Sequence, residues 1–225
     1  MENYLGAKNG SGVYQAIINL IPPHDTYIEP FLGTGAVLRR KAPAKLDIGL
    51  DLNERCIVKS NYTAAKIFQG DAFEYLANFN FSKSGQTVVY CDPPYVSATR
   101  TGTAKYKHEF TDDDHRKLLT LLKSLPCFVM LSGYKNAIYD EMLSDWWSFD
   151  FQAMTRGGVR TETIWCNFEP KDIHYHTYAG KNYTERQGIQ RKAERWANNF
   201  IKMSSGEQQA VLAAMLQAAS EQKGL

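Results

Sequence analysis

The sequence predicts an α/β protein with a doubly wound, mostly parallel sheet, an antiparallel strand pair that closes it, and a C-terminal helical extension. Up to about residue 130, runs rich in β-branched and aromatic residues alternate with segments of helical hydrophobic spacing. This order is typical of parallel strands joined by crossover helices. Two further strand-like runs then flank Arg156-Gly157-Gly158, as expected of an antiparallel hairpin. Beyond Pro170 only helical patterns occur.

The first helix is expected over residues 13–21, where apolar residues recur at helical spacing until Pro22 ends the pattern. Residues 33–35 then form a glycine-containing turn between the first strand and a helix through Val37 and Leu38. The expected strands cover residues 26–28, 46–52, 64–68, 87–91, 128–131, 149–153 and 163–168.

Two capping boxes mark the starts of later helices: Thr111 with Asp114, and Ser204 with Glu207. The first precedes a leucine-rich helix and the second an alanine-rich helix. Between them, residues 189–200 carry an apolar stripe at helical spacing, with basic residues on another side of the same helix.

We therefore expect two regions: residues 1–170 form a ligand-binding sheet domain, and residues 171–225 form a basic helical extension packed on the same domain. Residues 171–202 hold seven Lys or Arg against three Asp or Glu, although the formal net charge of the whole chain is only +2. A basic segment on a slightly acidic body favours a polyanionic partner.

Composition indicates a soluble globular protein, with 44% hydrophobic and 22% charged residues. No apolar run reaches the roughly 18 residues that a membrane helix needs, and the first twelve residues lack the pattern of a signal peptide. The expected compartment is the cytoplasm. The four cysteines form no CxxC pair, and only His174 and His176 lie close together, so neither a disulfide framework nor a metal site is expected.

Ligands of a doubly wound sheet bind beyond the carboxyl ends of its strands. Segment 29–35 and three acidic residues, Asp51, Asp71 and Asp92, stand at such ends. Glycines let the backbone approach a ligand closely. Asp51, sixteen residues after Gly35, can bind the hydroxyls of a ribose. Any adenosine-containing cofactor, NAD included, is compatible with this pattern.

The segment Asp92-Pro93-Pro94-Tyr95 decides between these cofactors, because hydride transfer has no use for it. Its prolines fix a rigid strand exit and remove two amide donors. The Asp92 carboxylate and the Pro93 carbonyl can then both accept hydrogen bonds from one aromatic amine. Such bonds favour a pyramidal nitrogen whose lone pair points at a sulfonium methyl. Tyr95 supplies a face on which a base can stack.

Over residues 4 to about 168 the chain resembles the Dam-like family of adenine-N6 DNA methyltransferases, which carry this tetrapeptide. The resemblance implies a Rossmann-like sheet and methyl transfer from S-adenosylmethionine to the exocyclic amine of an adenine flipped out of DNA. Catalysis is assigned to the tetrapeptide, Asp92, Pro93, Pro94 and Tyr95. Cofactor binding is assigned to Tyr4, Lys8, Glu29, Pro30, Phe31, Gly33, Gly35, Asp51, Asp71 and Asp92.

Many relatives carry a target-recognition domain between the third-strand Asp and the tetrapeptide, but here only twenty residues separate Asp71 from Asp92. This pattern resembles short methylases of phages and prophages, and it predicts a short or degenerate recognition site. DNA contacts are expected from the loop after the tetrapeptide, the hairpin turn and the C-terminal helix: Arg100, Lys105, Lys107, Arg156, Arg160, Lys192 and Arg195.

Two alternatives stay open. One is an RNA base-amine methyltransferase, because RNA can be recognised by shape without a dedicated domain. The other is a catalytically inactive DNA-binding protein of the same fold, against which the intact tetrapeptide argues. The leading interpretation expects double-stranded DNA and S-adenosylmethionine as partners, no membrane, no metal and no obligate protein partner. If a phage encodes the protein, its compartment is the cytoplasm of the host.

Overall fold

The computed structural model describes residue 8 and residues 13–58, 65–100, 108–155, 158–170 and 183–222. Tyr4, Lys105, Lys107 and Arg156, all predicted site residues, lie outside this part of the chain. The chain divides into two compact units, Met1–Thr177 and Tyr178–Leu225. The packing of the C-terminal extension on the sheet domain stays a prediction.

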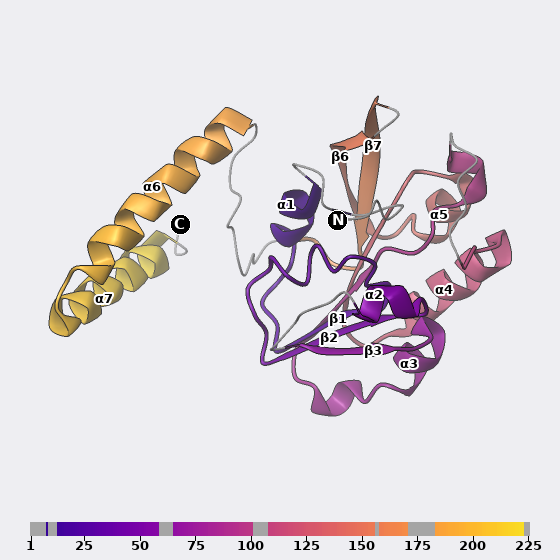
Figure 1. Ribbon diagram of the computed structural model, residues 1–225, viewed down its shortest axis with the longest axis horizontal. Coiled ribbons are helices and arrows are strands. Elements are labelled where there is room, and N and C mark those ends of the chain that lie inside the picture. The colour runs from indigo at the N-terminus through magenta and orange to yellow at the C-terminus, as the bar shows by residue number, and fades with distance from the viewer. Residues whose placement is uncertain are drawn as a thin grey trace. The chain divides into compact units, whose positions relative to one another are not determined.

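The first unit contains a seven-stranded sheet in the order β3-β2-β1-β4-β5-β7-β6 (Figure 1). β3, β2, β1, β4 and β5 pair in parallel, whereas β7 pairs antiparallel with both β5 and β6. The strand order reverses between β1 and β4, which is where doubly wound sheets bind ligands. The predicted fold class is confirmed. The strands are β1 Thr26–Glu29, β2 Leu46–Asp51, β3 Lys66–Gln69, β4 Thr87–Cys91, β5 Phe128–Gly133, β6 Trp147–Thr155 and β7 Gly158–Cys166.

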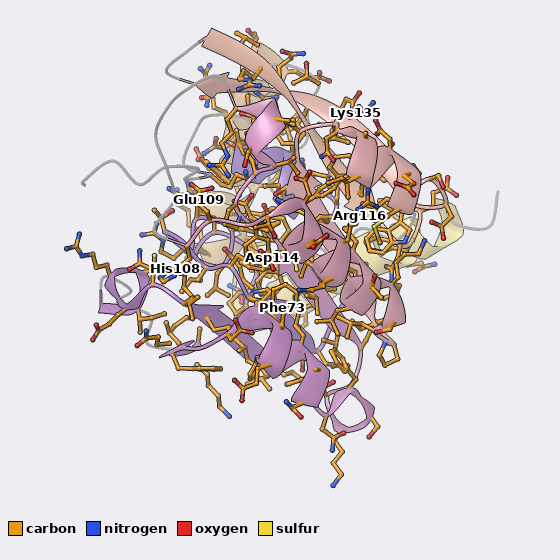
Figure 2. All side chains as sticks on the ribbon, turned by 90° about the vertical axis from the view of Figure 1, so that its right-hand side faces the viewer. Phe73, His108, Glu109, Asp114, Arg116 and Lys135 are labelled. Atoms are coloured by element: carbon orange, nitrogen blue, oxygen red, sulfur yellow. The ribbon has the colours of Figure 1, made fainter. Side chains whose placement is uncertain are left out.

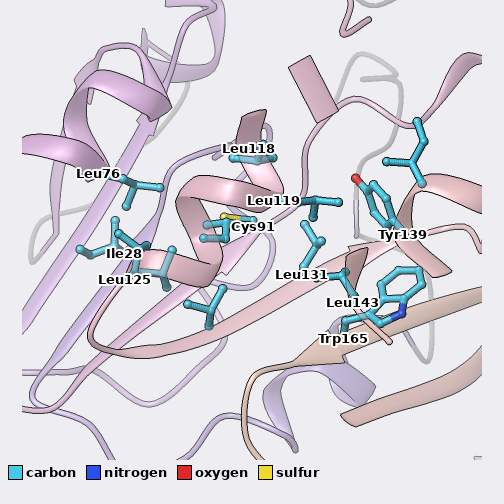
Figure 3. Packing of buried hydrophobic residues seen from close by; sticks show 14 of the residues in the cluster. Ile28, Leu76, Cys91, Leu118, Leu119, Leu125, Leu131, Tyr139, Leu143 and Trp165 are labelled. Atoms are coloured by element: carbon cyan, nitrogen blue, oxygen red, sulfur yellow. The ribbon is translucent and has the colours of Figure 1, made fainter. Parts of the chain in front are cut away.

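One face of the sheet is covered by helices α3, α4 and α5, which share a single apolar cluster with the strands (Figure 3). Leu118 and Leu119 of α4 are fully buried there and lie near Leu131 of β5. The Thr111–Asp114 capping box forms as predicted and fixes the start of α4. The helices of the first unit are α1 Val13–Ile18, α2 Glu54–Val58, α3 Ala72–Asn78, α4 Asp112–Ser124 and α5 Ala137–Met142, with 3-10 turns at η1 Phe81–Lys83 and η2 Ser97–Thr99.

The central strand β4 is buried on both faces, which explains its unbroken apolar sequence. Val89 and Cys91 belong to the cluster under α3, α4 and α5. Side chains alternate along a strand, so Val88 and Tyr90 point to the opposite face, where they are also fully buried. The opposite face therefore holds a buried hydroxyl close to the carboxyl end of the strand.

One predicted helix is absent, since residues 36–40 form turns instead of a helix through Val37 and Leu38. The Leu38 amide donates to Glu29 Oε2 at 3.0 Å rather than to a backbone carbonyl, so the helical ladder is interrupted. The prediction was wrong because apolar spacing does not reveal a buried carboxylate that competes for backbone amides.

The second unit consists of α6 Tyr183–Ile201 and α7 Ser205–Gln222. The predicted second capping box forms: the Ser204 amide donates to Glu207 Oε2 at 2.8 Å, and the Glu207 amide donates to Ser204 Oγ at 3.4 Å. Along the predicted apolar stripe, Trp196 keeps 51% of its surface exposed. Within the described residues, no helix combines the length and the apolar character needed to cross a membrane.

Leu119→Ala should lower the free energy of unfolding by about 2–5 kcal/mol, because the deletion leaves a cavity under α4 where Leu119 is fully buried. Urea unfolding followed by circular dichroism measures the loss. The exposed neighbour Lys117→Ala serves as control and should change stability little. Equal effects of the two substitutions would contradict the assigned packing.

Candidate active site

The glycine turn after β1 is held open by a carboxylate from the next strand. Gly33 and Gly35 have φ values of 50° and 59°, a left-handed conformation that favours glycine. Asp51, at the end of β2, accepts from the Gly33 amide through Oδ2 and from the Asn53 amide through Oδ1, both at 2.8 Å. Asp51 therefore ties the turn to β2 and fixes the backbone that faces the strand ends.

A cavity of about 890 Å³, open to solvent, lies at these strand ends. One wall is aromatic: Phe110 packs at 5.8 Å from both Phe31 and Phe73, measured between ring centroids. His108 belongs to the same lining, and Figure 2 shows it with Phe73 on the side turned to the viewer. The predicted site residues in the lining are Lys8, Glu29, Pro30, Phe31, Gly33, Asp51, Asp71, Asp92, Pro93 and Pro94.

Asp71 reaches this cavity while it also caps a helix. Its Oδ1 accepts from the Glu74 amide at 2.9 Å and so starts α3. The contact of Asp71 with a cofactor stays a prediction.

Glu29 is a buried acid beneath the glycine turn. Burial raises the pKa of its carboxyl group to about 8, although bonds from the Tyr27 hydroxyl and the Leu38 amide, both at 3.0 Å, oppose the shift. Glu29 is therefore mostly protonated at neutral pH, and it adds little negative charge to the cavity.

Asp92 follows β4 directly, and Ser132 and Lys8 both contact the same carboxylate oxygen, Oδ1. Its Oδ1 accepts from Ser132 Oγ at 3.0 Å and lies 2.9 Å from Lys8 Nζ. Ser132 in turn lies 3.0 Å from the Tyr90 hydroxyl. Since the Ser132 proton points to Asp92, Tyr90 is the donor in that second bond. Burial raises the pKa of Asp92, while the Lys8 ammonium opposes the increase.

Lys8 is a buried ammonium that contacts three groups. Its Nζ lies near Asp92 Oδ1, lies 3.2 Å from Glu162 Oε2 and contacts the Tyr95 hydroxyl. Burial alone would lower the pKa of Lys8, but the two carboxylates outweigh burial and raise it. Nζ is 4.7 Å from the Tyr95 ring centroid. Because it also contacts the hydroxyl, it lies at the edge of the ring and not over its face.

Tyr95 and Gly35 are not in the cavity lining, although neighbouring residues are. Tyr95 is 7% exposed and packs edge-on against Tyr134, with ring centroids 4.6 Å apart. The role of Tyr95 in stacking a base stays a prediction.

Two arginines that were predicted to contact nucleic acid donate hydrogen bonds to groups of the protein itself. Arg100 donates to the Tyr95 carbonyl at 2.7 Å and to both oxygens of Glu109 at 2.9 and 2.6 Å. Arg160 donates to the Thr99 carbonyl at 2.7 Å, and its guanidinium lies 4.1 Å from the Tyr134 ring centroid. Both thus anchor the segment that follows the tetrapeptide. Lys192 and Arg195 are exposed on α6, in the second unit.

Among the residues with contacts at this site that the sequence interpretation missed are Ser132, Glu162, Phe73 and Phe110. Period-two alternation in the last strand could have placed Glu162 on the same face as Ile164. It would not have shown that the carboxylate is buried. Within the described residues, no group of three or more His, Cys, Asp or Glu is arranged to hold a metal ion.

Comparison with known proteins gives a match to a family model. Residues 60–161 match the model described as D12 class N6 adenine-specific DNA methyltransferase. The protein is an S-adenosylmethionine-dependent methyltransferase. The match confirms the resemblance drawn from the sequence, and its range includes Asp71 and the tetrapeptide. The phage origin and the missing recognition domain stay predictions.

Several solved structures are similar to this methyltransferase. The N-methyltransferase NodS from Bradyrhizobium japonicum, in complex with S-adenosyl-L-homocysteine, has a TM-score of 0.47 at 11% identity, over 69% of this chain and 86% of that one. The O-methyltransferase TomG from Streptomyces achromogenes, in complex with S-adenosylmethionine, has a TM-score of 0.46 at 13% identity, over 68% and 76%. No curated protein matches the sequence.

The cavity of the methyltransferase fits this cofactor. The cavity is lined by the carboxylates of Asp51, Asp71 and Asp92, which can accept hydrogen bonds from hydroxyl groups and attract a sulfonium cation. The wall that contains Phe31 can pack against an aromatic ring. The left-handed glycine turn brings backbone, without a Cβ at Gly33, to the cavity wall.

Asp51→Ala in the methyltransferase should weaken S-adenosylmethionine binding roughly tenfold or more, because it orphans two amides and removes a carboxylate expected at the ribose. Isothermal titration calorimetry measures the affinity. Asp51→Asn keeps an acceptor and should lose less, and the exposed Asp113→Ala should lose nothing. Unchanged affinity in Asp51→Ala would contradict the assignment.

Glu29→Gln should remove part of the pH dependence of stability. Because the folded pKa is about 8 against an ordinary 4.5, the folded state keeps a proton that the unfolded state releases between these values. Stability from this group is therefore full below pH 4.5 and is lost as the pH rises to 8, at up to about 1.4 kcal/mol per pH unit.

Urea unfolding at pH 5, 6.5 and 8 tests this. The decline with pH should be shallower in Glu29→Gln than in wild type. The exposed Glu141→Gln should retain the wild-type slope. Parallel profiles for wild type and Glu29→Gln would show that Glu29 is ionised in the folded protein.

Proposed function

We propose that the methyltransferase transfers a methyl group to the exocyclic amine of adenine in double-stranded DNA. One observation carries the proposal: the acceptor groups of Asp92 and the prolines after it open on the same cavity as Asp51 and the glycine turn. The family match supports adenine in DNA as the substrate.

The backbone that follows β4 can accept hydrogen bonds from an aromatic amine. Pro93 and Pro94 have no amide hydrogen, so this backbone offers acceptors without competing donors. In the described residues no side chain or amide is bonded to Asp92 Oδ2. We assign this oxygen and the Pro93 carbonyl to the two amine hydrogens. Hydrogen bonds of this kind stabilise the positive charge that develops on the nitrogen.

Asp51 would hold the ribose hydroxyls of S-adenosylmethionine, and the Phe31 side of the cavity would hold its adenine. When bound, this cofactor supplies a methyl group activated by a positively charged sulfur. With the cofactor in place, Asp92 Oδ2 and the Pro93 carbonyl would hold the amine with its lone pair toward that methyl group. Asp92 orients the amine and stabilises its charge throughout.

An adenine inside a duplex cannot reach the cavity, because its amine is paired, so the base is flipped out. The aromatic ring of Tyr95, at the end of the tetrapeptide, is the candidate for stacking, which contributes about 1–3 kcal/mol per base. Lys8 contacts the hydroxyl edge of this ring.

Affinity for DNA is assigned to the exposed Lys192 and Arg195 of α6, whose phosphate contacts carry no sequence information. With Arg100 and Arg160 engaged inside the protein, few described side chains are left to read base edges. This supports the prediction of a short or degenerate recognition site.

Asp92→Ala should reduce methyl transfer to less than about a tenth of the wild-type rate while the fold is kept, because the carboxylate acts mainly in the transition state. Tritiated methyl incorporation into unmethylated plasmid and into structured RNA measures activity and substrate class. Nanopore sequencing then maps the modified adenines. Asp113→Ala is the matched surface control.

Incorporation into RNA but not DNA would replace the proposal with RNA base-amine methylation. Wild-type cofactor binding without any transfer would favour an inactive DNA-binding protein.

A further inference from the structure

Glu162 is a buried carboxylate whose presence the cavity chemistry does not explain. It lies in β7 opposite Phe151 and is only 5% exposed. Its Oε2 lies 3.2 Å from Lys8 Nζ but has no hydrogen-bond partner among the described residues. A buried carboxylate with so little compensation costs stability, which points to a role beyond folding.

The contacts of Asp92 show what the Lys8 ammonium does. Lys8 and Ser132 both bind Oδ1, so the carboxylate cannot rotate without breaking two polar contacts. Oδ2 is thereby directed away from both groups. Because these contacts fix one oxygen of the carboxylate, the other oxygen can meet a substrate amine in a fixed direction.

The charge balance explains the second carboxylate. If Lys8 faced Asp92 alone, the ammonium would neutralise it and weaken it as an acceptor for developing positive charge. Because Lys8 is shared with Glu162, the three groups together carry a net charge of −1. The sharing also holds Nζ between two strands, β4 with its following Asp92 and β7.

We propose that Glu162 is a positioning residue for methyl transfer: it shares Lys8 with Asp92, holds the ammonium on Oδ1, and leaves an anionic carboxylate with Oδ2 directed at the amine. This inference rests on the proposed function. It adds a residue from the antiparallel edge of the sheet to the machinery at the parallel strand ends.

The experiment measures single-turnover methylation of a DNA duplex from pH 5 to 9. Single turnover removes product release from the measured rate. Glu162→Gln keeps the shape of the side chain but removes its charge, so the maximal rate should fall roughly tenfold or more. The acid limb, meaning the part of the pH–rate profile in which the rate falls as the pH is lowered, should shift to lower pH, because Glu162 raises the pKa of Asp92 in the wild type.

Lys8→Met should shift the acid limb in the opposite direction, because the Lys8 ammonium lowers the pKa of Asp92. Glu162→Asp restores the charge and should recover part of the rate. Glu141→Gln, an exposed control, should change neither rate nor limb. The other titratable groups that interact with Asp92 are Glu29, Tyr90, Cys91, Tyr134 and Tyr139, and all are retained in these variants.

A purely structural Glu162 would lower thermal stability without moving the acid limb. The inference is overturned if folded Glu162→Gln keeps a rate within about twofold of wild type and an unmoved limb. A wild-type enzyme inactive on DNA would refute the proposed function instead.

Carbon-13 NMR titration of the Asp92 carboxyl group in the protein alone then decides the positioning inference without any substrate. Its pKa should fall in Glu162→Gln and rise in Lys8→Met. No change in Glu162→Gln would overturn the inference even if the variant were inactive for another reason. If that variant does not fold, the pKa of Asp92 should rise in Lys8→Met and stay near the wild-type value in Glu162→Asp, which keeps the charge. An unmoved pKa in Lys8→Met would then overturn the inference.

Discussion

Asp92 is a largely buried carboxyl group at the end of β4, and much of the polar structure around it offsets the cost of that burial. Burial raises the pKa of Asp92, and the Lys8 ammonium offsets part of this cost. Lys8 is itself buried, so its own charge needs both Asp92 and Glu162 nearby. Ser132 and Tyr90 extend the network into β5 and β4. Removing Lys8 would leave the carboxylates of Asp92 and Glu162 without the cation that they share.

The cavity limits its negative charge in two different ways. Lys8 balances part of the charge at Asp92, whereas Glu29 is kept neutral by its own burial. Asp51 uses both carboxylate oxygens to hold backbone amides of the glycine turn and the β2 exit. These acidic residues therefore have different roles. Asp51 positions the backbone, Glu29 stays protonated, and Asp92 is paired with an ammonium.

The segment after the tetrapeptide is tied to the body by arginines. Arg100 joins the Tyr95 carbonyl to Glu109, and Arg160 of β7 joins the Thr99 carbonyl to the ring of Tyr134. The antiparallel strand pair thus contributes both Glu162 and Arg160 to the region around the tetrapeptide. In this methyltransferase the hairpin positions the residues of the parallel strand ends as well as closing the sheet.

The succession of strands along the chain, both capping boxes and the position of the cavity residues at strand ends could be predicted from the sequence, because periodicity, turn residues and caps are local. The helix through Val37 and Leu38 could not be ruled out, since apolar spacing does not show that the Glu29 carboxylate, before the glycine turn, accepts from the Leu38 amide. Arg100 and Arg160 were predicted to contact DNA because local sequence does not reveal their acceptors within the protein.

The sequence by itself determined the fold class and the chemical types present at the site: a glycine turn, acids at strand ends and a rigid Asp-Pro-Pro-Tyr exit. Only the tertiary structure decided which acids are charged and which cation they share. Protonation and ion pairing depend on burial and on distances of a few ångströms between strands far apart in the chain, such as β4 and β7.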